Sequence, residues 1–175
     1  KQLTALGMKA AQLDARLSEC SPTPDGLEEV EFLFSANPGQ PLKPLGKVAS
    51  GGELSRVSLA IQVICARNLT VPSLVFDEVD VGVGGGVAEI VGRLLRELGQ
   101  HAQVLCITHQ PQVASQGHQH WQVHKIQGDD TTHTRIQGLD ETARVEELAR
   151  MLGGVEITES TRNHAKEMLS KAQAA

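Results

Sequence analysis

The segment from residue 74 to residue 86 constrains the fold of this chain more than any other, because it reads LVFDEVDVGVGGG. Three apolar residues run into Asp77, Glu78 and Asp80, and a cluster of glycines follows. An apolar run between a proline and a glycine-rich turn is typical of a fully buried strand in a parallel sheet. Ligands of α/β folds bind at the carboxyl ends of such strands. The segment therefore predicts an α/β fold with metal and proton chemistry at the end of this strand.

A second strand of the same kind follows a helical pattern at residues 87–98. The apolar run at 104–107 ends in Thr108 and His109, and Pro111 prevents its simple continuation. Strand, helix and strand in this order predict a parallel crossover. We therefore expect His109 at the same edge of the sheet as the carboxylates.

The four residues Ser50, Gly51, Gly52 and Glu53 begin a segment with an apolar stripe, which predicts a largely buried helix. Ser50 and Glu53 stand in the S-x-x-E relation of a capping box. The two glycines leave backbone N–H groups of the first turn uncovered, so a phosphate could approach the positive end of the helix dipole. Taken alone, the four residues are better explained as an ordinary capped helix start.

The remaining elements follow from periodicity. Leucines at spacings of three and four predict an amphipathic helix with a coiled-coil-like seam over residues 1–19. A run with two prolines and a glycine ends that helix, and alternating apolar residues then predict a strand at 28–36, followed by a loop. The other predicted elements are two short strands within 119–137 joined at 128–130, and helices at 141–152 and 158–172.

Composition excludes some partners. The chain has 16 Lys+Arg against 21 Asp+Glu, a net charge of −5, which argues against broad attraction to nucleic acid or an anionic membrane through this segment alone. Three dispersed cysteines fit neither a disulfide framework nor a Cys-x-x-Cys metal site, which indicates a reducing cytoplasm. No stretch is apolar enough to span a membrane. The sequence does not begin with Met, and we expect it to be a fragment.

The residues at the predicted sheet edge suit a nucleotide with Mg²⁺. A carboxylate such as Asp77 would hold the cation, Glu78 would polarise an attacking water, and His109 would contact the terminal phosphate. The alternatives are a pair of loop carboxylates that cap the following turn and a surface histidine. No phosphate loop of the G-x-x-x-x-G-K-[ST] type occurs in the chain.

These motifs together resemble those of a known family. Ala49 to Glu53 resembles the signature of ABC ATPases, LVFDE at 74–78 a Walker B motif with its catalytic glutamate, Asp80 the D-loop, and His109 the switch histidine. Over residues 25–155 the chain resembles the carboxyl-terminal half of the RecN family of bacterial DNA repair proteins, relatives of the SMC proteins. Four stretches carry this resemblance: VEFLFSANPGQPLKPLGKVASGGELSR, FDEVDVGVGGG, ITHQPQVAS and RVEELARMLGG.

The resemblance implies an ATPase head built from both ends of a long chain, with the Walker A motif in the amino-terminal half and an antiparallel coiled coil between the halves. Residues 1–19 would then be the end of the returning coiled-coil helix. Residues 20–175 would be the carboxyl-terminal lobe of the head, a parallel sheet flanked by helices.

The resemblance also implies a cycle in which two heads enclose two ATP molecules. Asp77 would bind Mg²⁺ and Asp80 would contact the other head. Glu78 and His109 would be catalytic, and residues 50–53 (Ser50, Gly51, Gly52 and Glu53) would cap the ATP held by the second head. The family is understood to use this cycle on DNA ends in double-strand break repair, and DNA would be bound through the full assembly.

Two alternatives stay open. The chain could belong to another SMC-like chromosome or repair factor. It could also be a folding and interaction module that completes a partner's domain and has no activity alone, which the missing Walker A motif favours for the isolated chain.

Overall fold

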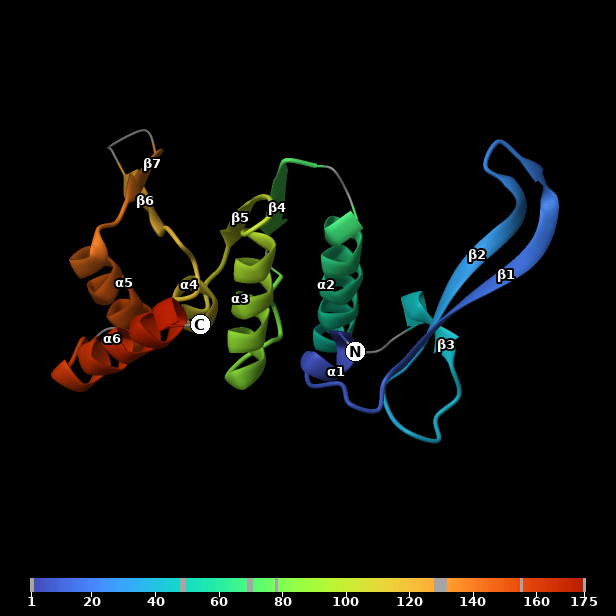
Figure 1. The fold of residues 1–175 in the computed structure, drawn as a ribbon, viewed down its shortest axis with the longest axis horizontal. Coiled ribbons are helices and arrows are strands. Elements are labelled where there is room, and N and C mark those ends of the chain that lie inside the picture. Colours follow the sequence, from blue (N-terminus) through green and yellow to red (C-terminus); the bar gives the residue numbers. More distant parts are fainter. Residues whose placement is uncertain are drawn as a thin grey trace. The chain divides into compact units, whose positions relative to one another are not determined.

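A computed structural model of the chain describes residues 2–47, 50–68, 71–77, 79–127, 132–154 and 156–174. It divides into two compact units (Figure 1). The first comprises residues 1–69 and 81–83, and the second comprises residues 70–80 and 84–175. No helix within the described ranges is long and apolar enough to cross a membrane.

The first unit contains a long antiparallel hairpin. Strand β1 (Gln12–Thr23) pairs with β2 (Gly26–Ser35), and β2 pairs with the short β3 (Lys43–Pro44). The register places Leu13 opposite Phe34 and Leu17 opposite Val30. The strand predicted at 28–36 is therefore confirmed to within two residues at its start and one at its end.

The helix predicted over residues 1–19 is wrong beyond its first turn. Helix α1 spans only Gln2–Ala5, and Gly7 leaves the helical region with a φ of 79°. Leucines at 13 and 17 share a face in a helix of period 3.6 and equally in a strand of period 2. The alternating partner strand β2 decides between them, because pairing satisfies both backbones. A coiled-coil stub at the amino terminus is therefore withdrawn.

Helix α2 (Gly51–Asn68) is confirmed, but it is buried on one side only. Val57, Leu59 and Val63 have at most 1% of their surface exposed, whereas Leu54 and Ile64 lie 40% and 49% exposed. Val57 packs with Met8 and Phe34 in the core of this unit. The 3₁₀ turn η1 (Leu45–Lys47) precedes the helix.

The second unit contains the predicted parallel crossover. Strand β4 (Ser73–Asp77) pairs in parallel with β5 (Gln103–Ile107), and helix α3 (Gly86–Leu98) between them packs against β5. The prediction that the first strand is fully buried is wrong. Phe76 is 4% exposed, but three apolar residues on the opposite face lie open, namely Val75 at 66%, Leu105 at 51% and Ile107 at 56%.

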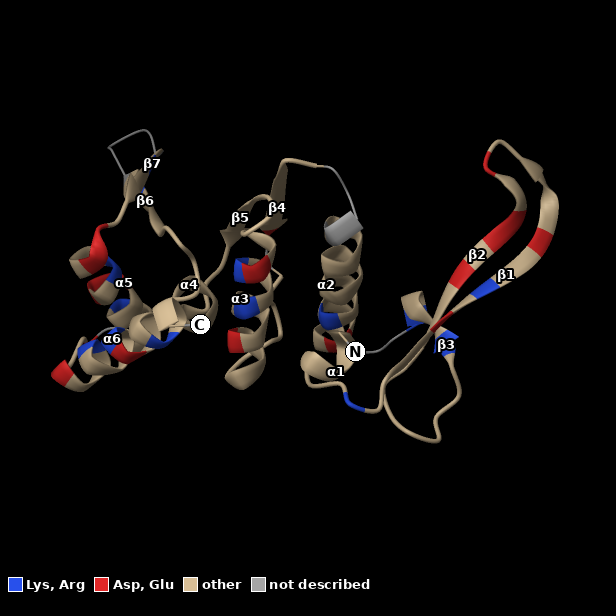
Figure 2. Cartoon of the chain, viewed as in Figure 1, with Lys and Arg blue, Asp and Glu red and all other residues tan. Residues whose placement is uncertain are grey.

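The remaining elements follow β5 in order. The one-turn helix α4 (Pro111–Ala114) leads to the antiparallel pair β6 (Trp121–Gln127) and β7 (Thr132–Gly138). The predicted hairpin is thus confirmed, while its turn at residues 128–130 lies outside the described residues. Helices α5 (Glu141–Gly153) and α6 (Glu159–Ala174) pack through a shared apolar cluster that includes Leu148, Ala149, Ala165 and Leu169. Both helices carry basic and acidic residues (Figure 2).

Candidate functional site

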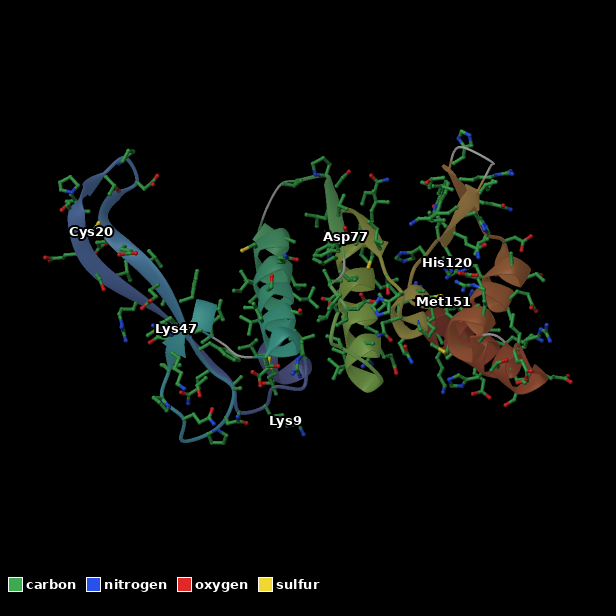
Figure 3. The ribbon with its side chains drawn as sticks, turned by 180° about the vertical axis from the view of Figure 1, so that it is seen from behind. Lys9, Cys20, Lys47, Asp77, His120 and Met151 are labelled. Carbon is green, nitrogen blue, oxygen red and sulfur yellow. The ribbon has the colours of Figure 1, made fainter. Side chains whose placement is uncertain are left out.

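The carboxyl ends of β4 and β5 form one edge of the parallel pair. Asp77 is paired with Ile107, so the residues that follow each of them leave the sheet together. Asp77 is exposed at this end (Figure 3). Beyond the two strand ends, His109 Nδ1 lies 3.8 Å from Asp80 Oδ1. The prediction that the histidine and the carboxylates meet at one edge is confirmed for Asp77, Asp80 and His109, while Glu78 lies outside the described residues.

Asp80 is the most deeply buried polar group at this edge, with 0% of its surface exposed. Its Oδ2 accepts a hydrogen bond from the Thr108 hydroxyl, and its Oδ1 has no hydrogen-bond partner among the described residues. The head-contact role expected for Asp80 stays a prediction, while in this unit its carboxylate bonds to Thr108.

Thr108 is a residue of this edge that the sequence interpretation did not assign to the site. Its hydroxyl donates to Asp80 and accepts a hydrogen bond of 2.9 Å from the backbone N–H of Gln110. It thereby fixes the backbone on both sides of His109. A threonine directly after a buried strand and before a candidate histidine was the only signal available, and such a residue is common at strand ends.

His109 projects outward from this frame. Its side chain is 67% exposed, and its Nε2 lies 3.3 Å from Nε2 of Gln110. The Nδ1 edge of the imidazole therefore lies toward the buried carboxylate, while most of the side chain is open to solvent. A ligand at the strand ends could reach it.

The electrostatic potential at this edge is negative. Burial, followed by the charges of Asp80 and Asp77, raises the pKa of the Cys106 thiol to about 12. The same two carboxylates would favour a divalent cation, and Asp77 is the exposed one. The described residues contain no group of three or more His, Cys, Asp or Glu side chains able to hold a metal.

The start of α2 is built around two glycines with different surroundings. The Ser50 hydroxyl accepts a hydrogen bond of 3.4 Å from the Glu53 backbone N–H, which supplies one half of the predicted capping box. A Cβ at Gly51 would meet nothing within 4 Å. A Cβ at Gly52 would lie 2.9 Å from the carbonyl oxygen of Gly82, whose own φ is +70°. The first glycine faces open space, whereas the second allows two backbones to touch.

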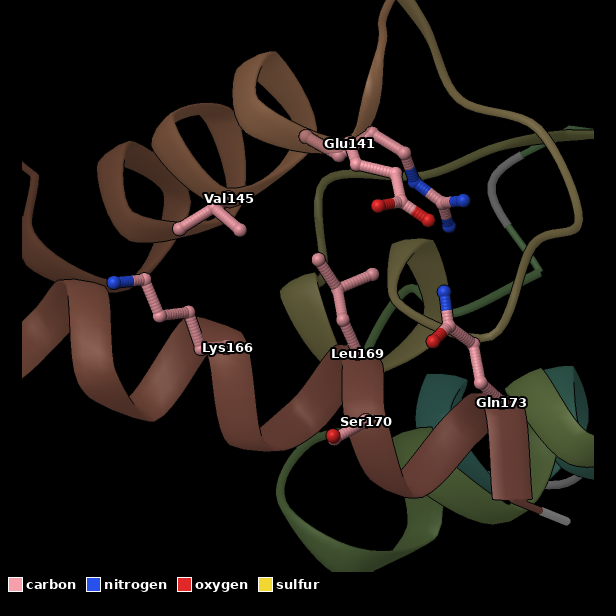
Figure 4. Close-up of a pocket in the computed structure, with 7 residues that line it drawn as sticks. Glu141, Val145, Lys166, Leu169, Ser170 and Gln173 are labelled. Atoms are coloured by element: carbon pink, nitrogen blue, oxygen red, sulfur yellow. The ribbon is translucent and has the colours of Figure 1, made fainter.

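A cavity of about 140 Å³ lies between α5 and α6 (Figure 4). Its polar lining comes from Glu141, Arg144, Lys166, Ser170 and Gln173. The Arg144 guanidinium is committed to structure, since it donates to the carbonyl oxygens of Gly117 and His118 at 2.7 and 3.2 Å. This cavity contains none of the residues that the sequence assigns to the site.

Comparison with known proteins gives one consistent family. The DNA repair protein RecN of Vibrio cholerae is 54% identical over 169 residues, which cover 95% of this chain and 30% of that protein. RecN of Xylella fastidiosa is 52% identical over 174 residues, which cover 98% of this chain, and RecN of Bacillus subtilis is 48% identical over 150 residues. The chain is RecN-like. It spans about three tenths of the length of the RecN proteins of Xylella fastidiosa and Vibrio cholerae, and no family model matches it.

Solved structures show the fold of the RecN-like chain. The Smc head domain with a coiled coil and joint from Pyrococcus yayanosii matches with a TM-score of 0.65 at 19% identity, over 84% of this chain and 27% of that one. A chain from work on ATP-driven dimerization and DNA-stimulated activation of SMC ATPases matches with a TM-score of 0.57 at 18% identity, over 85% of this chain and 87% of that one. The RecN-like chain therefore has the fold of part of an SMC head, as its motifs predicted.

Proposed function

We propose that this chain is the carboxyl-terminal part of an SMC-like ATPase head that acts in DNA double-strand break repair. The observation that carries the proposal is the meeting of Asp77, Asp80 and His109 at the end of one parallel strand pair. Relatives named DNA repair protein RecN, which match almost the whole chain, support the biological role. That role would bring the protein into the cytoplasm, at the bacterial chromosome.

The strand-end edge is the proposed hydrolytic site. Asp77 would hold Mg²⁺, which when bound neutralises phosphate charge. Glu78 would accept a proton from the attacking water, and His109 would donate a hydrogen bond to the terminal phosphate of ATP. The charges of Asp80 and Asp77, which add to burial in raising the Cys106 pKa, support the cation, because a site of like charges needs a counterion.

The start of α2 is the proposed contact with the nucleotide of a second head. Gly51 is exposed with open space beside it, so backbone N–H groups of the first turn can approach a phosphate. The Ser50 hydroxyl and the helix dipole would add to that attraction, with Glu53 completing the signature. ATP would thus join two copies of the head, and hydrolysis would release them.

The missing phosphate loop would come from the amino-terminal half of the same protein. The exposed apolar face of the β4–β5 pair, formed by Val75, Leu105 and Ile107, supports such a partner. Parallel sheets in α/β proteins are covered on both faces, and a patch of this kind marks an interaction surface. Without that half we expect the chain to bind no nucleotide and to act only as the module that completes the head.

The replacement Glu78→Gln in the full-length protein tests the proposal. It removes the proton acceptor and keeps the shape, so we expect ATP hydrolysis to fall about 10²-fold or more while ATP binding remains. Glu89→Gln is the matched control, because Glu89 is an exposed glutamate in the first turn of α3 and has no proposed role in hydrolysis. Unchanged turnover in Glu78→Gln would refute the assignment.

A further inference from the structure

The buried carboxylate of Asp80 has one oxygen that is satisfied and one that is not. Oδ2 accepts from the Thr108 hydroxyl, whereas Oδ1 is buried without a hydrogen-bond partner among the described residues. Leaving such an oxygen unpaired is unfavourable, so a donor nearby should be drawn to it. His109 offers such a donor, since its Nδ1 is 3.8 Å from Asp80 Oδ1.

A second hydrogen bond of Thr108 connects it to the backbone beside His109. The Thr108 hydroxyl accepts from the Gln110 backbone N–H at 2.9 Å, so Asp80, Thr108 and the backbone around His109 form one connected unit. The imidazole needs only a small movement to bring Nδ1–H to hydrogen-bond distance from Oδ1. When the Nδ1–H group of a histidine donates a hydrogen bond to a carboxylate, that bond fixes the tautomer and the orientation of the ring.

We propose that Asp80, held by Thr108, is a positioning residue for His109: it binds Nδ1 of the imidazole and thereby directs Nε2 toward the reacting phosphate. This inference rests on the proposed ATPase function. It adds a role within one head to the head-contact role expected for Asp80, and it assigns Thr108 a role that depends on its hydroxyl. Neither residue touches the nucleotide.

The test is steady-state ATP hydrolysis by the full-length protein with Thr108→Val, which removes the hydroxyl and nearly preserves the shape. We expect kcat to fall about 10-fold with little change in KM, because the ground-state contacts of ATP are intact. Thr108→Ser, which keeps the hydroxyl, should restore kcat to within about 2-fold of the original. Equal loss in the Val and Ser variants would contradict the inference.

Variants made in a protein that lacks the His109 side chain separate a role of Thr108 in positioning His109 from a purely structural effect. If Thr108 acts through His109, then in His109→Ala the added Thr108→Val should change kcat by less than about 2-fold. The same 10-fold loss in both backgrounds would overturn the inference. If Thr108→Val does not fold, Asp80→Asn replaces it, since the amide still accepts from Thr108 but lacks the charge that attracts the imidazole; it should lower kcat in the native background and not in His109→Ala.

Failure of this inference can be told apart from failure of the proposed function. If Glu78→Gln and His109→Ala both lower hydrolysis while Thr108→Val and Asp80→Asn do not, the ATPase assignment stands and the positioning role is wrong. If the full-length protein does not hydrolyse ATP, or Glu78→Gln has no effect, the proposed function itself fails.

Discussion

The strand-end edge and the start of α2 are both proposed to handle phosphate, yet they are built in opposite ways. At the edge, side chains from two strand ends bond to each other, with Thr108 joined to the buried Asp80 and His109 beside them. At the start of α2, Gly51 has open space where a side chain would be. A bonded frame fixes the protein's own groups for chemistry, whereas an open helix terminus leaves room for a ligand. The difference supports the proposal that the edge carries out catalysis and that the helix start caps the nucleotide.

The largest effect that would break this comparison is expected from Gly51→Asp. A Cβ at this position meets nothing within 4 Å, and an acid suits the first turn of a helix, so the fold should be retained. It would place negative charge against a phosphate, and we expect ATP hydrolysis by the full-length protein to fall about 10²-fold. Ser58→Asp, on an exposed position further along α2, is the control. Normal hydrolysis in Gly51→Asp would mean that the helix start binds no phosphate.

The two glycines sharpen the comparison within α2 itself. In Gly52→Ala the new Cβ would lie 2.9 Å from the Gly82 carbonyl oxygen, so the backbone must shift, and we expect a loss of about 1–3 kcal/mol in the free energy of unfolding. Gly51→Ala should leave stability unchanged or raise it by up to about 1 kcal/mol. Urea unfolding of the chain followed by circular dichroism measures both. Equal midpoints for the two variants would contradict the close approach of residues 52 and 82.

The smallest effect is expected from His120, a residue outside the proposed site, which should make the free energy of unfolding depend on pH. Burial, and then the nearby charge of Arg144, lowers the pKa of His120 from its ordinary 6.5, against a weaker opposing effect of Glu147 (His120 is labelled in Figure 3). The folded state therefore favours neutral His120. Its contribution to stability is complete above about pH 6.5 and is lost as the pH falls toward the lowered value.

Fluorescence of Trp121, the only tryptophan of the chain, reports unfolding next to this histidine. We expect the apparent urea midpoint to fall between about pH 7 and about pH 5.5, and the fall to be smaller in His120→Gln. His164→Gln, an exposed histidine on α6, should behave as the unmodified chain does. An identical pH dependence in His120→Gln would show that other groups cause it.

Much of the fold could be predicted from the sequence where one pattern admits one structure. Helix α3 is framed by glycines and has a single apolar stripe, and strands β4 and β5 are short apolar runs on either side of it. The helix predicted over the first nineteen residues was wrong because leucines four apart fit both a helix and a strand. Only the pairing with β2 decides between the two structures. The open face of β4 and β5 was missed because apolar composition predicts burial within the chain, whereas here Val75 and its neighbours remain exposed.

The site divides in the same way. Residue types and their order placed Asp77, Asp80 and His109 at one edge, since parallel strands end together. The burial of Asp80 and its bond to Thr108 could not be predicted from the sequence. An acid two residues after Glu78 can point inward or outward, and no sequence pattern decides which. The contact of Gly52 with Gly82 likewise joins residues that are distant in sequence.

The most direct test of the division between catalytic edge and capping helix mixes two inactive full-length variants, Gly51→Asp and Glu78→Gln. In a mixed dimer, one site combines an intact Glu78 with an intact helix start from the other protomer, while the second site carries both defects. Random mixing of equal amounts should therefore restore about a quarter of the original ATP hydrolysis if each dimer has two independent sites. Activity no higher than that of either variant alone would contradict the account, because both defects would then act within one head.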